Sequence, residues 1–541
     1  MSADTGSGND LARLQKSPAA VASLQNAQQY LRNRRYGPAL AAFRKLTEQF
    51  PGIPHLWGEL GMAAAGELEF EEAEVAFKRA TALTNADVDL FLTIGMQYYR
   101  MRRLEQASEC HLRAVALDPS SVNARLTLAS WYERIRKLDE SWECVETCLA
   151  QHPNNPRARY FKAFLLNRKG QNTEAESLLR DLLKSEGVPP EVQANGWHQL
   201  GVVLDALGQY PEALPCLGKS KSLRRQFVNA AAMEQTYEMV AQTRRKVLAE
   251  LTPDMVKKWR DDAAATPTPM PLAFLGGAPR SGTTLIEQIL GAHPGILAVD
   301  EPQGFAHELL PVLHPTPPAK GLTTKSLNFL TASERGHLIA RYFKSALREA
   351  PVDNSNQLRE GQAPRAPEIP SHKLFIDKNP SVTASLHIWL RLFPLSKIII
   401  ALRDPRDVII SCYFQNIKLM WGNVAFLSLD KTAKFYGDCM DVWLRMRELG
   451  GFDWLESRYE DVVKDLEAEG RRVTSFLGLT WDPAQATYYE NARHKFVHAP
   501  TYEEVTKPVY KKAVGRWENY SEALAPFQET LVKYCKTFGY A

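Results

Sequence analysis

The sequence predicts two kinds of fold in one chain: an all-α repeat solenoid, followed by an α/β domain with a central parallel sheet. Three observations predict this. Small residues recur at a 34-residue period through the first half, a proline-rich segment interrupts the chain near residue 265, and strands alternate with helices after it. The 541 residues are enough for two to four domains of roughly 150 residues each.

Composition excludes several classes of protein. Apolar residues make up 45% of the chain and charged residues 24%, which is ordinary for a soluble globular protein and excludes collagen-like or largely disordered chains. The 66 Lys and Arg residues nearly balance the 62 Asp and Glu residues, and a net charge of +4 does not by itself indicate nucleic-acid binding. Any anion site must therefore be built locally.

Hydropathy and cysteine content predict a cytoplasmic location. No stretch of about 18 uncharged apolar residues occurs, so we expect no membrane span. The N-terminus is polar and acidic, unlike a signal peptide. Seven cysteines are too few and odd in number for a disulfide framework. Cys144 and Cys148, one helical turn apart, are interpreted as small apolar helix residues rather than zinc ligands.

The repeat is carried by a small residue spaced by 34 positions, with one final spacing of 38. Its members are Ala39, Ala73, Ala107, Ser141, Ala175 and Ala213. A larger residue lies four positions after each: Phe43, Phe77, His111, Val145, Leu179 and Leu217. The small residue lets two helices approach closely, and this is the tetratricopeptide pattern of paired antiparallel helices. Stacked pairs cover one another's apolar faces and form a curved solenoid.

These patterns predict the limits of the domains. We expect a flexible N-terminus over 1–19, about six repeats over 20–226, capping helices and a linker over 227–268, and the α/β domain over 269–541. Within the last part, strands are predicted at 272–275, 397–402 and 452–459, and helices from 285, from 407 and over 463–477. The Pro-rich and polar segments 314–328 and 352–372 are expected to be loops.

The first chemical motif runs from Gly276 to Leu285 (GGAPRSGTTL), between a predicted strand and a predicted helix. Gly277, Gly282, Thr283 and Thr284 have the spacing of a P-loop, except that Thr283 stands at the lysine position. In such a loop the backbone N–H groups and the helix N-terminus cradle a phosphate. The missing lysine disfavours ATP or GTP hydrolysis, so a kinase or NTPase remains only an alternative.

The second motif runs from Ile398 to Cys412 and again joins a strand to a helix. Arg403 lies at the carboxyl end of the strand, where open α/β sheets bind ligands, and Ser411 follows within the helix. A guanidinium and a hydroxyl can grip a second phosphate. Taken alone, the Arg-Asp-Pro-Arg-Asp sequence also fits a salt-bridged surface turn.

Together the two motifs resemble the sulfotransferase family, whose donor is 3′-phosphoadenosine 5′-phosphosulfate (PAPS), and tyrosylprotein sulfotransferases in particular. The resemblance covers 271–541. It identifies the first motif with the 5′-phosphosulfate loop and the second with the 3′-phosphate site. Tetratricopeptide repeats followed by a sulfotransferase domain also resemble a widespread group of tandem proteins.

The resemblance implies roles for individual residues. Donor binding would involve Arg280, Ser281, Gly282, Thr283, Thr284, Arg403, Ser411, Tyr459, Thr501 and Lys507, with Thr501 standing where the family has a serine. Catalysis would involve Glu301 as general base, Lys378 at the transferring group, and Arg280; no metal is required. The intervening segment 303–374 matches poorly, so the acceptor contacts are open.

Plainer readings exist for these residues. Glu301 could cap a helix, Lys378 could be a surface lysine, and Tyr459 could serve packing. His293, His372 and His498 are further candidate bases, but small-molecule sulfotransferases carry their base histidine where this chain has Asn379.

The resulting functional prediction is a PAPS-dependent sulfotransferase that modifies an acceptor hydroxyl, foremost a protein tyrosine. The solenoid would bind the acceptor or a partner protein, since concave repeat surfaces hold peptides. Two alternatives stay open: a tetratricopeptide scaffold whose C-terminal domain binds nucleotide without catalysis, and a sulfotransferase acting on a carbohydrate or small-molecule hydroxyl. Neither nucleic acid nor a membrane is an expected partner.

Overall fold

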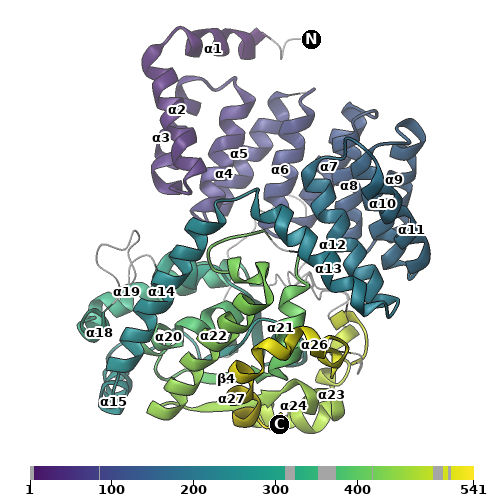
Figure 1. The fold of residues 1–541 in the computed structure, drawn as a ribbon. Helices are drawn as coiled ribbons and strands as arrows, with labels where there is room; N and C mark the ends of the chain where they lie inside the picture. Colours follow the sequence, from purple (N-terminus) through teal and green to yellow (C-terminus); the bar gives the residue numbers. More distant parts are fainter. Residues whose placement is uncertain are drawn as a thin grey trace. The chain divides into compact units, whose positions relative to one another are not determined.

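The computed structural model describes residues 5–84, 86–310, 323–350, 373–416, 418–490, 504–509 and 513–540 (Figure 1). Contacts along the chain divide it into two compact units, the first ending at Gln171 and the second beginning at Asn172. The domain limits expected from the sequence, with the α/β domain over 269–541, differ from this division of the chain. They stay a prediction.

The first unit is entirely helical within its described residues. Its helices are α1 (Thr5–Gln15), α2 (Pro18–Arg32), α3 (Tyr36–Gln49), α4 (Pro54–Gly66), α5 (Phe70–Leu83), α6 (Val88–Arg100), α7 (Leu104–Leu117), α8 (Val122–Arg134), α9 (Leu138–Gln151) and α10 (Pro156–Arg168). From α2 to α9 they pack as consecutive pairs. The helices and the buried repeat positions confirm the tetratricopeptide solenoid that the 34-residue period predicts.

Close packing explains the small residues of the repeat. A Cβ on Gly61 would lie 2.4 Å from the Phe77 ring, and one on Gly95 would lie 2.7 Å from the His111 ring. Ala39, Ala73, Ala107 and Ser141 are fully buried. Gly61 and Gly95 therefore leave room for a large side chain on the second helix of their pair.

The turn inside each helix pair repeats as well. One residue per turn adopts a left-handed backbone with φ between 55° and 79°: Arg34, Leu68, Arg102, Arg136, Gly170 and Gly208. Their spacing is again 34 residues, then 38. Only two of the six are glycines, so no recurring glycine in the sequence marks this turn.

The second unit begins with α11 (Asn172–Lys184), α12 (Pro190–Ala206), α13 (Tyr210–Arg225), α14 (Ala230–Glu250) and α15 (Pro253–Asp262). The helices α14 and α15 lie within 227–268, where the sequence predicts capping helices and a linker. Their buried side chains Val247, Leu251 and Trp259 belong to one apolar cluster with Phe274 and Trp443. The helices before the linker thus share a core with the α/β part.

The centre of the second unit is a five-stranded, all-parallel sheet, as predicted. Its strands are β1 (Leu272–Gly277), β2 (Ile296–Asp300), β3 (Leu374–Lys378), β4 (Lys397–Leu402) and β5 (Trp454–Arg458), in the order β2-β3-β1-β4-β5. The predicted strands coincide with β1, β4 and β5. The short strands β2 and β3 were not recognised, and 324–328, expected to be loop, form helix α18 (Thr324–Asn328).

Helices cover both faces of the sheet. Alternate residues of β4 enter different clusters: Ile398 and Ile400 pack with α20 (Leu386–Leu392), α21 (Pro405–Tyr413) and α22 (Leu429–Leu449), while Ile399 packs with α16 (Thr283–Gly291) and α24 (Leu466–Phe476). The remaining helices of this unit include α19 (Ala332–Arg348), α23 (Tyr459–Lys464), α26 (Ser521–Leu524) and α27 (Gln528–Phe538). Because all strands run the same way, their carboxyl ends meet at one edge.

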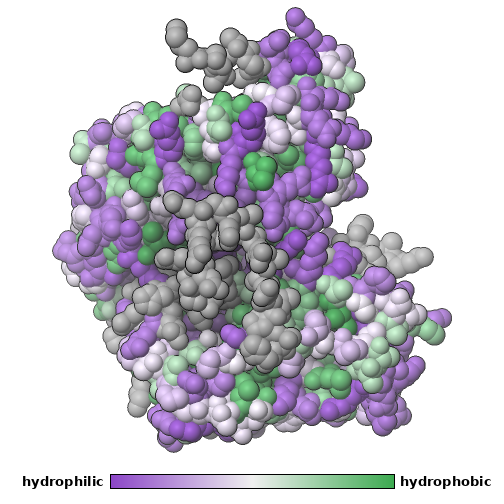
Figure 2. Space-filling view, turned by 180° about the vertical axis from the view of Figure 1, so that it is seen from behind, coloured by the Kyte–Doolittle hydropathy of each residue, from purple (hydrophilic) through white to green (hydrophobic). Residues whose placement is uncertain are grey.

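The surface in Figure 2 is mostly hydrophilic, with hydrophobic residues in small groups. In the part of the chain that the structure describes, every helix is too short or too polar to cross a bilayer.

Candidate active site at the carboxyl edge of the sheet

The loop between β1 and α16 is shaped by three residues with left-handed backbones: Gly277 (φ 132°), Arg280 (φ 72°) and Gly282 (φ 96°). Glycine is required at 277, because a Cβ there would lie 2.3 Å from the carbonyl oxygen of Ala401 on β4. The N–H of Gly277 donates to Thr383 Oγ1 at 2.8 Å. The loop is therefore held against β4 on one side and the segment after β3 on the other.

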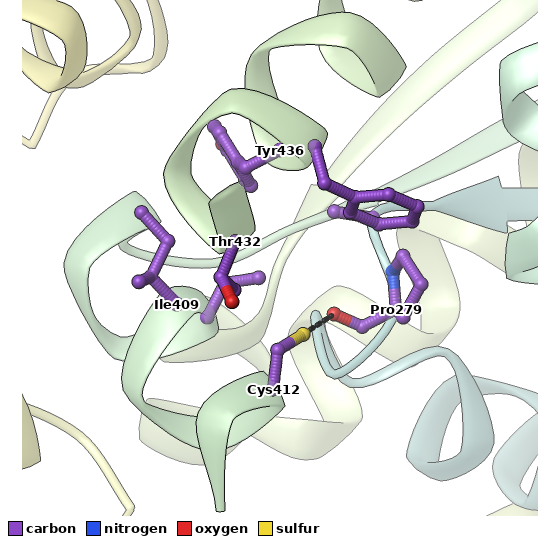
Figure 3. A pocket seen from close by; sticks show the side chains of 8 residues that line it. Pro279, Ile409, Cys412, Thr432 and Tyr436 are labelled. Atoms are coloured by element: carbon purple, nitrogen blue, oxygen red, sulfur yellow. Dashed lines mark hydrogen bonds between the residues drawn. The ribbon is translucent and has the colours of Figure 1, made fainter. Parts of the chain in front are cut away.

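The same loop also packs against side chains of α21 and α22. Figure 3 shows Pro279 facing Ile409, Cys412, Thr432 and Tyr436 of α21 and α22. The Cys412 thiol donates to the Pro279 carbonyl at 3.5 Å, and burial raises the pKa of Cys412 to about 12. The thiol is therefore neutral at pH 7, and the loop contacts both α21 and α22.

The two sequence motifs meet at this loop. Arg280 Nε donates to Ser411 Oγ at 3.1 Å, and Arg403 Nη1 donates to the Arg280 carbonyl at 3.3 Å. Arg403 also faces Asp407 Oδ2 at 3.7 Å and donates to the Ala513 carbonyl. Two guanidinium groups are thereby gathered beside the N-terminus of α16, where an anion is favoured.

Two buried polar atoms at this place have unused hydrogen-bonding capacity. Ser281 is 1% exposed and Arg403 8%, yet among the described residues neither Ser281 Oγ nor Arg403 Nε has a hydrogen-bond partner. Buried polar atoms are normally paired, so such atoms point to a missing ligand or water. Thr283 is buried at the first turn of α16, and Thr284 beside it is half-buried.

Tyr459, which directly follows β5, packs against the loop between β1 and α16. A Cβ on Gly282 would lie 2.7 Å from its ring, and the Arg403 guanidinium carbon lies 5.1 Å from the ring centroid. Burial raises the pKa of Tyr459, with Arg403 acting in the opposite direction. Tyr459 therefore packs against Gly282 of the loop and against Arg403 of the second motif.

A buried ion cluster forms where β2 and β3 end. Lys378 is fully buried and forms ion pairs with Asp300 and with Glu301 Oε1, the latter at 3.1 Å. The Glu301 N–H donates to the Lys378 carbonyl at 2.8 Å, and the Glu301 side chain remains 43% exposed. Lys378 is thus not a surface lysine, and Glu301 has one oxygen held by an ammonium while the side chain reaches solvent.

The charge state of Lys378 follows from its neighbours. Burial opposes its positive charge, but the carboxylates of Asp300, Glu301 and Glu287 outweigh burial and raise the pKa of Lys378. Lys378 therefore stays cationic at neutral pH.

Comparison with known proteins identifies both parts of the chain. Residues 271–483 match the sulfotransferase family, and residues 24–88 match the tetratricopeptide repeat. The chain joins tetratricopeptide repeats to a sulfotransferase-family domain. This assignment agrees with the helical solenoid and with the parallel sheet.

Individual relatives are distant. An uncharacterized protein of Aquifex aeolicus (strain VF5) is 26% identical over 362 residues, covering 66% of this chain and 44% of that protein. Protein-tyrosine sulfotransferase A of Caenorhabditis elegans is 26% identical over 260 residues, covering 46% of this chain and 61% of that protein. The sulfotransferase domain of the Synechococcus PCC 7002 olefin synthase is similar with 23% identity and a TM-score of 0.35, covering 51% of this chain and 96% of that domain. This chain therefore spans less than two thirds of the first two proteins.

The remaining residues singled out from the sequence of this domain are Lys507, Thr501 and three histidines. Lys507 is exposed, and its carbonyl accepts from the Tyr488 hydroxyl at 3.1 Å. Thr501, His372 and His498 lie outside the described residues. His293 is used structurally, since its Nδ1 accepts from the Gly295 N–H at 2.9 Å and its Nε2 lies 2.9 Å from the Thr480 carbonyl.

Sequence reasoning missed several buried acids of the sulfotransferase-family domain. Asp300, paired with Lys378, directly precedes Glu301, and Glu287 lies on α16. Asp377 is fully buried and accepts from the Tyr342 hydroxyl at 2.6 Å; burial raises the pKa of Asp377 to about 8. Two adjacent acids ending a strand were the available signal for Asp300. The sequence around Glu287 and Asp377 offered no comparable signal.

Proposed function

We propose that this protein transfers the sulfuryl group of PAPS to an acceptor hydroxyl, foremost that of a protein tyrosine. The observation that carries the proposal is the meeting of Arg280, Ser281, Arg403 and Ser411 at the N-terminus of α16. These groups come from two motifs more than 100 residues apart in the sequence. The family match over 271–483 supports the same reaction class.

The residues present fit a donor with two separate anionic ends. Ser281 Oγ, the loop backbone and the α16 N-terminus would hold the phosphosulfate end. Arg403 and Ser411 would hold the 3′-phosphate, with Arg403 Nε as a spare donor. The buried and unpartnered Ser281 Oγ and Arg403 Nε are the atoms expected to gain bonds. When bound, PAPS supplies an activated sulfuryl group.

Glu301 suits the removal of a proton from the acceptor. A tyrosine hydroxyl, with a pKa near 10, needs a base at neutral pH. Glu301 combines an exposed side chain with one oxygen held by Lys378, so its other oxygen is the one to take the acceptor proton.

Lys378 and Arg280 supply positive charge beside the reaction. Charge that develops on the transferring group would be stabilised by fixed cations in a partly dehydrated site. Lys378 is held by Asp300 and Glu301, so direct contact with the donor requires one of these ion pairs to open. Until then, Lys378 acts through the orientation of Glu301.

A protein acceptor is favoured by the accompanying repeats. Tetratricopeptide solenoids present surfaces suited to extended peptides, and we propose that this one recruits the acceptor or a partner. Transfer to a sugar or to a small phenol remains the second candidate. A cytoplasmic location stays a prediction from the sequence.

The direct test is sulfate transfer by the full chain. Purified protein would be incubated with labelled PAPS and a tyrosine peptide library, and products would be identified by mass spectrometry. We expect sulfated tyrosine. Bisphosphate binding without any transfer to tyrosine, sugar or phenol would instead establish a nucleotide-binding scaffold.

Donor binding can be measured separately by calorimetry with adenosine 3′,5′-bisphosphate. Arg280→Ala and Arg403→Ala should each lower the affinity by about 2 kcal/mol, because each removes charge-assisted hydrogen bonds. Arg471→Ala is the matched control, since Arg471 lies on the exposed side of α24, paired with Glu467. Unchanged affinity in both site variants would remove the donor-site assignment.

A further inference from the structure

The last repeat pair, α12 and α13, contacts two segments of the second unit: residues 414–415 after α21, and residues 516–520. On α12, Asp205 accepts two hydrogen bonds from Arg516, at 2.8 Å and 3.3 Å, and one from the Tyr520 hydroxyl. The Tyr210 and Tyr520 rings pack edge to face with centroids 5.6 Å apart. A single carboxylate of the repeat pair thus anchors both ends of residues 516–520.

The anchored segment continues into the donor site. The N–H groups of Gly515 and Trp517 both donate to Asp407, at 2.9 Å and 2.8 Å, and the Ala513 carbonyl accepts from Arg403. Asp407 in turn faces Arg403 at 3.7 Å. Residues 513–520 therefore form a clamp segment that connects Asp205 to the guanidinium of Arg403.

A second link joins the repeat pair to α21, the helix that carries Ser411. His198 Nε2 lies 2.9 Å from the Phe414 carbonyl, and Lys221 Nζ donates to the Gln415 carbonyl at 2.7 Å. Carbonyls at a helix C-terminus have no partner within the helix, so side-chain donors there fix the helix end. Both donors are buried. The repeat pair therefore contacts the chain directly after α21 through His198 and Lys221. It contacts the clamp segment through Asp205.

We propose that α12 and α13 form a positioning element of the donor site, in which Asp205 holds the clamp segment against Arg403 and Asp407. The inference rests on the proposed donor site. Asp205 touches no donor atom; it acts through Arg516 and Tyr520. In this arrangement Asp205 of the final repeat helps to position the donor site, and the repeat does not serve partner recruitment alone.

Hydrogen exchange tests the anchoring without any ligand. Asp205→Ala in the full chain should speed exchange at the Gly515 and Trp517 amides by tenfold or more, while amides in β1 keep their protection. Glu212→Ala is the matched control, because Glu212 on α13 forms an exposed ion pair with Arg180. Equal protection of 513–520 in wild type and Asp205→Ala would overturn the inference.

Binding and kinetics test the consequence for the donor. Asp205→Ala should weaken adenosine 3′,5′-bisphosphate binding by about tenfold, because Arg403 is then no longer held in place to make its charge-assisted hydrogen bonds to the ligand. The donor KM should rise by the same factor while the acceptor KM stays unchanged, a split that general destabilisation would not produce. Tyr520→Phe removes a single hydroxyl and should act in the same direction with a smaller effect, which covers the case of a poorly folding Asp205→Ala.

The outcomes separate this inference from the proposed function. Wild type that fails to bind the bisphosphate would overturn both the donor site and the positioning role. Wild type that binds it, with Asp205→Ala and Tyr520→Phe binding equally well, would overturn the positioning role alone.

Discussion

Lys378 shows how burial changes the meaning of a residue. The sequence predicts a catalytic cation at Lys378, with a surface lysine beside Asp377 as the alternative. In the structure it is fully buried between Asp300 and Glu301, with its pKa raised. An isolated buried ammonium would be costly, so the two carboxylates are needed for Lys378 to remain charged.

Substitution of Glu301 separates proton transfer from binding. Glu301→Gln keeps the shape and a hydrogen bond to Lys378 but cannot take the acceptor proton, so turnover should fall by about 10²–10⁴. Bisphosphate affinity should remain near that of wild type. Steady-state rates with a tyrosine peptide and calorimetry provide the two measurements.

Acceptor acidity distinguishes Glu301 from Lys378. A phenol of low pKa arrives ionised and needs no base, so it should restore turnover in Glu301→Gln but not in Lys378→Ala. Rescue of neither variant, or wild-type turnover of a tyrosine peptide by Glu301→Gln, would exclude Glu301 as the base.

The loop between β1 and α16 depends on Gly277, whose backbone lies close to the carbonyl of Ala401 on β4. In Gly277→Ala the new methyl group would meet the Ala401 carbonyl, and φ of 132° is unfavourable for alanine. We expect loss of bisphosphate binding and a lower melting temperature. Gly422→Ala is the control, because a Cβ at Gly422 meets open space. If both variants bind alike, the loop does not need this close approach.

At the level of elements, periodicity predicted best where it was long. The 34-residue period identified the helix pairs, and the runs of β-branched residues in β4 marked a buried strand. The strands β2 and β3 have only five residues each, and β3 alternates little before Asp377 and Lys378. Short strands leave too few residues for a pattern; β3 is a strand because it pairs with β1, and β2 because it pairs with β3.

The buried side chain of His198, which contacts the Phe414 carbonyl after α21, should make the free energy of unfolding depend on pH. Burial lowers the pKa of His198 to about 4, against roughly 6.5 when unfolded. As pH falls from 6.5 towards 4, the unfolded chain takes up a proton that the folded protein refuses, so stability is lost. Between pH 7 and 5 this loss should be about 2 kcal/mol.

Urea denaturation at both pH values measures this dependence. His198→Gln keeps a donor for the Phe414 carbonyl and should reduce the loss on acidification. His337→Gln, on the exposed side of α19, should leave it unchanged. An identical pH dependence in wild type and His198→Gln would show that His198 does not remain neutral in the folded state.

For the whole molecule, the main result is where the chain divides. The sequence predicts a boundary at the proline-rich segment near residue 265, and contacts along the chain divide it between Gln171 and Asn172 as well. The side chains of Leu217, Val247 and Trp259 lie in the same apolar cluster as the sheet. A short linker in sequence does not prevent the helices before it from packing on the strands and helices after it.

Two fragments test this division. Residues 172–541 should bind adenosine 3′,5′-bisphosphate with the affinity of the full chain. Residues 268–541 lack several buried partners, each worth roughly 1.5–3 kcal/mol, and should melt at a lower temperature. Calorimetry and thermal melting compare them directly. Equal stability of the two fragments would place the boundary at the linker.

The sequence alone determined the repeat architecture and the parallel α/β domain, because these depend on local spacing and on strand–loop–helix order, and it predicted the residues of the loop between β1 and α16. Tertiary structure decided the rest. It set Asp300 and Glu301 on either side of one buried lysine, joined Arg280 to Ser411 across 131 positions, and tied Asp205 to the clamp segment more than 300 positions away. Such contacts arise from the pairing of parallel strands and the packing of helices on them, and no local pattern encodes which distant side chains will meet.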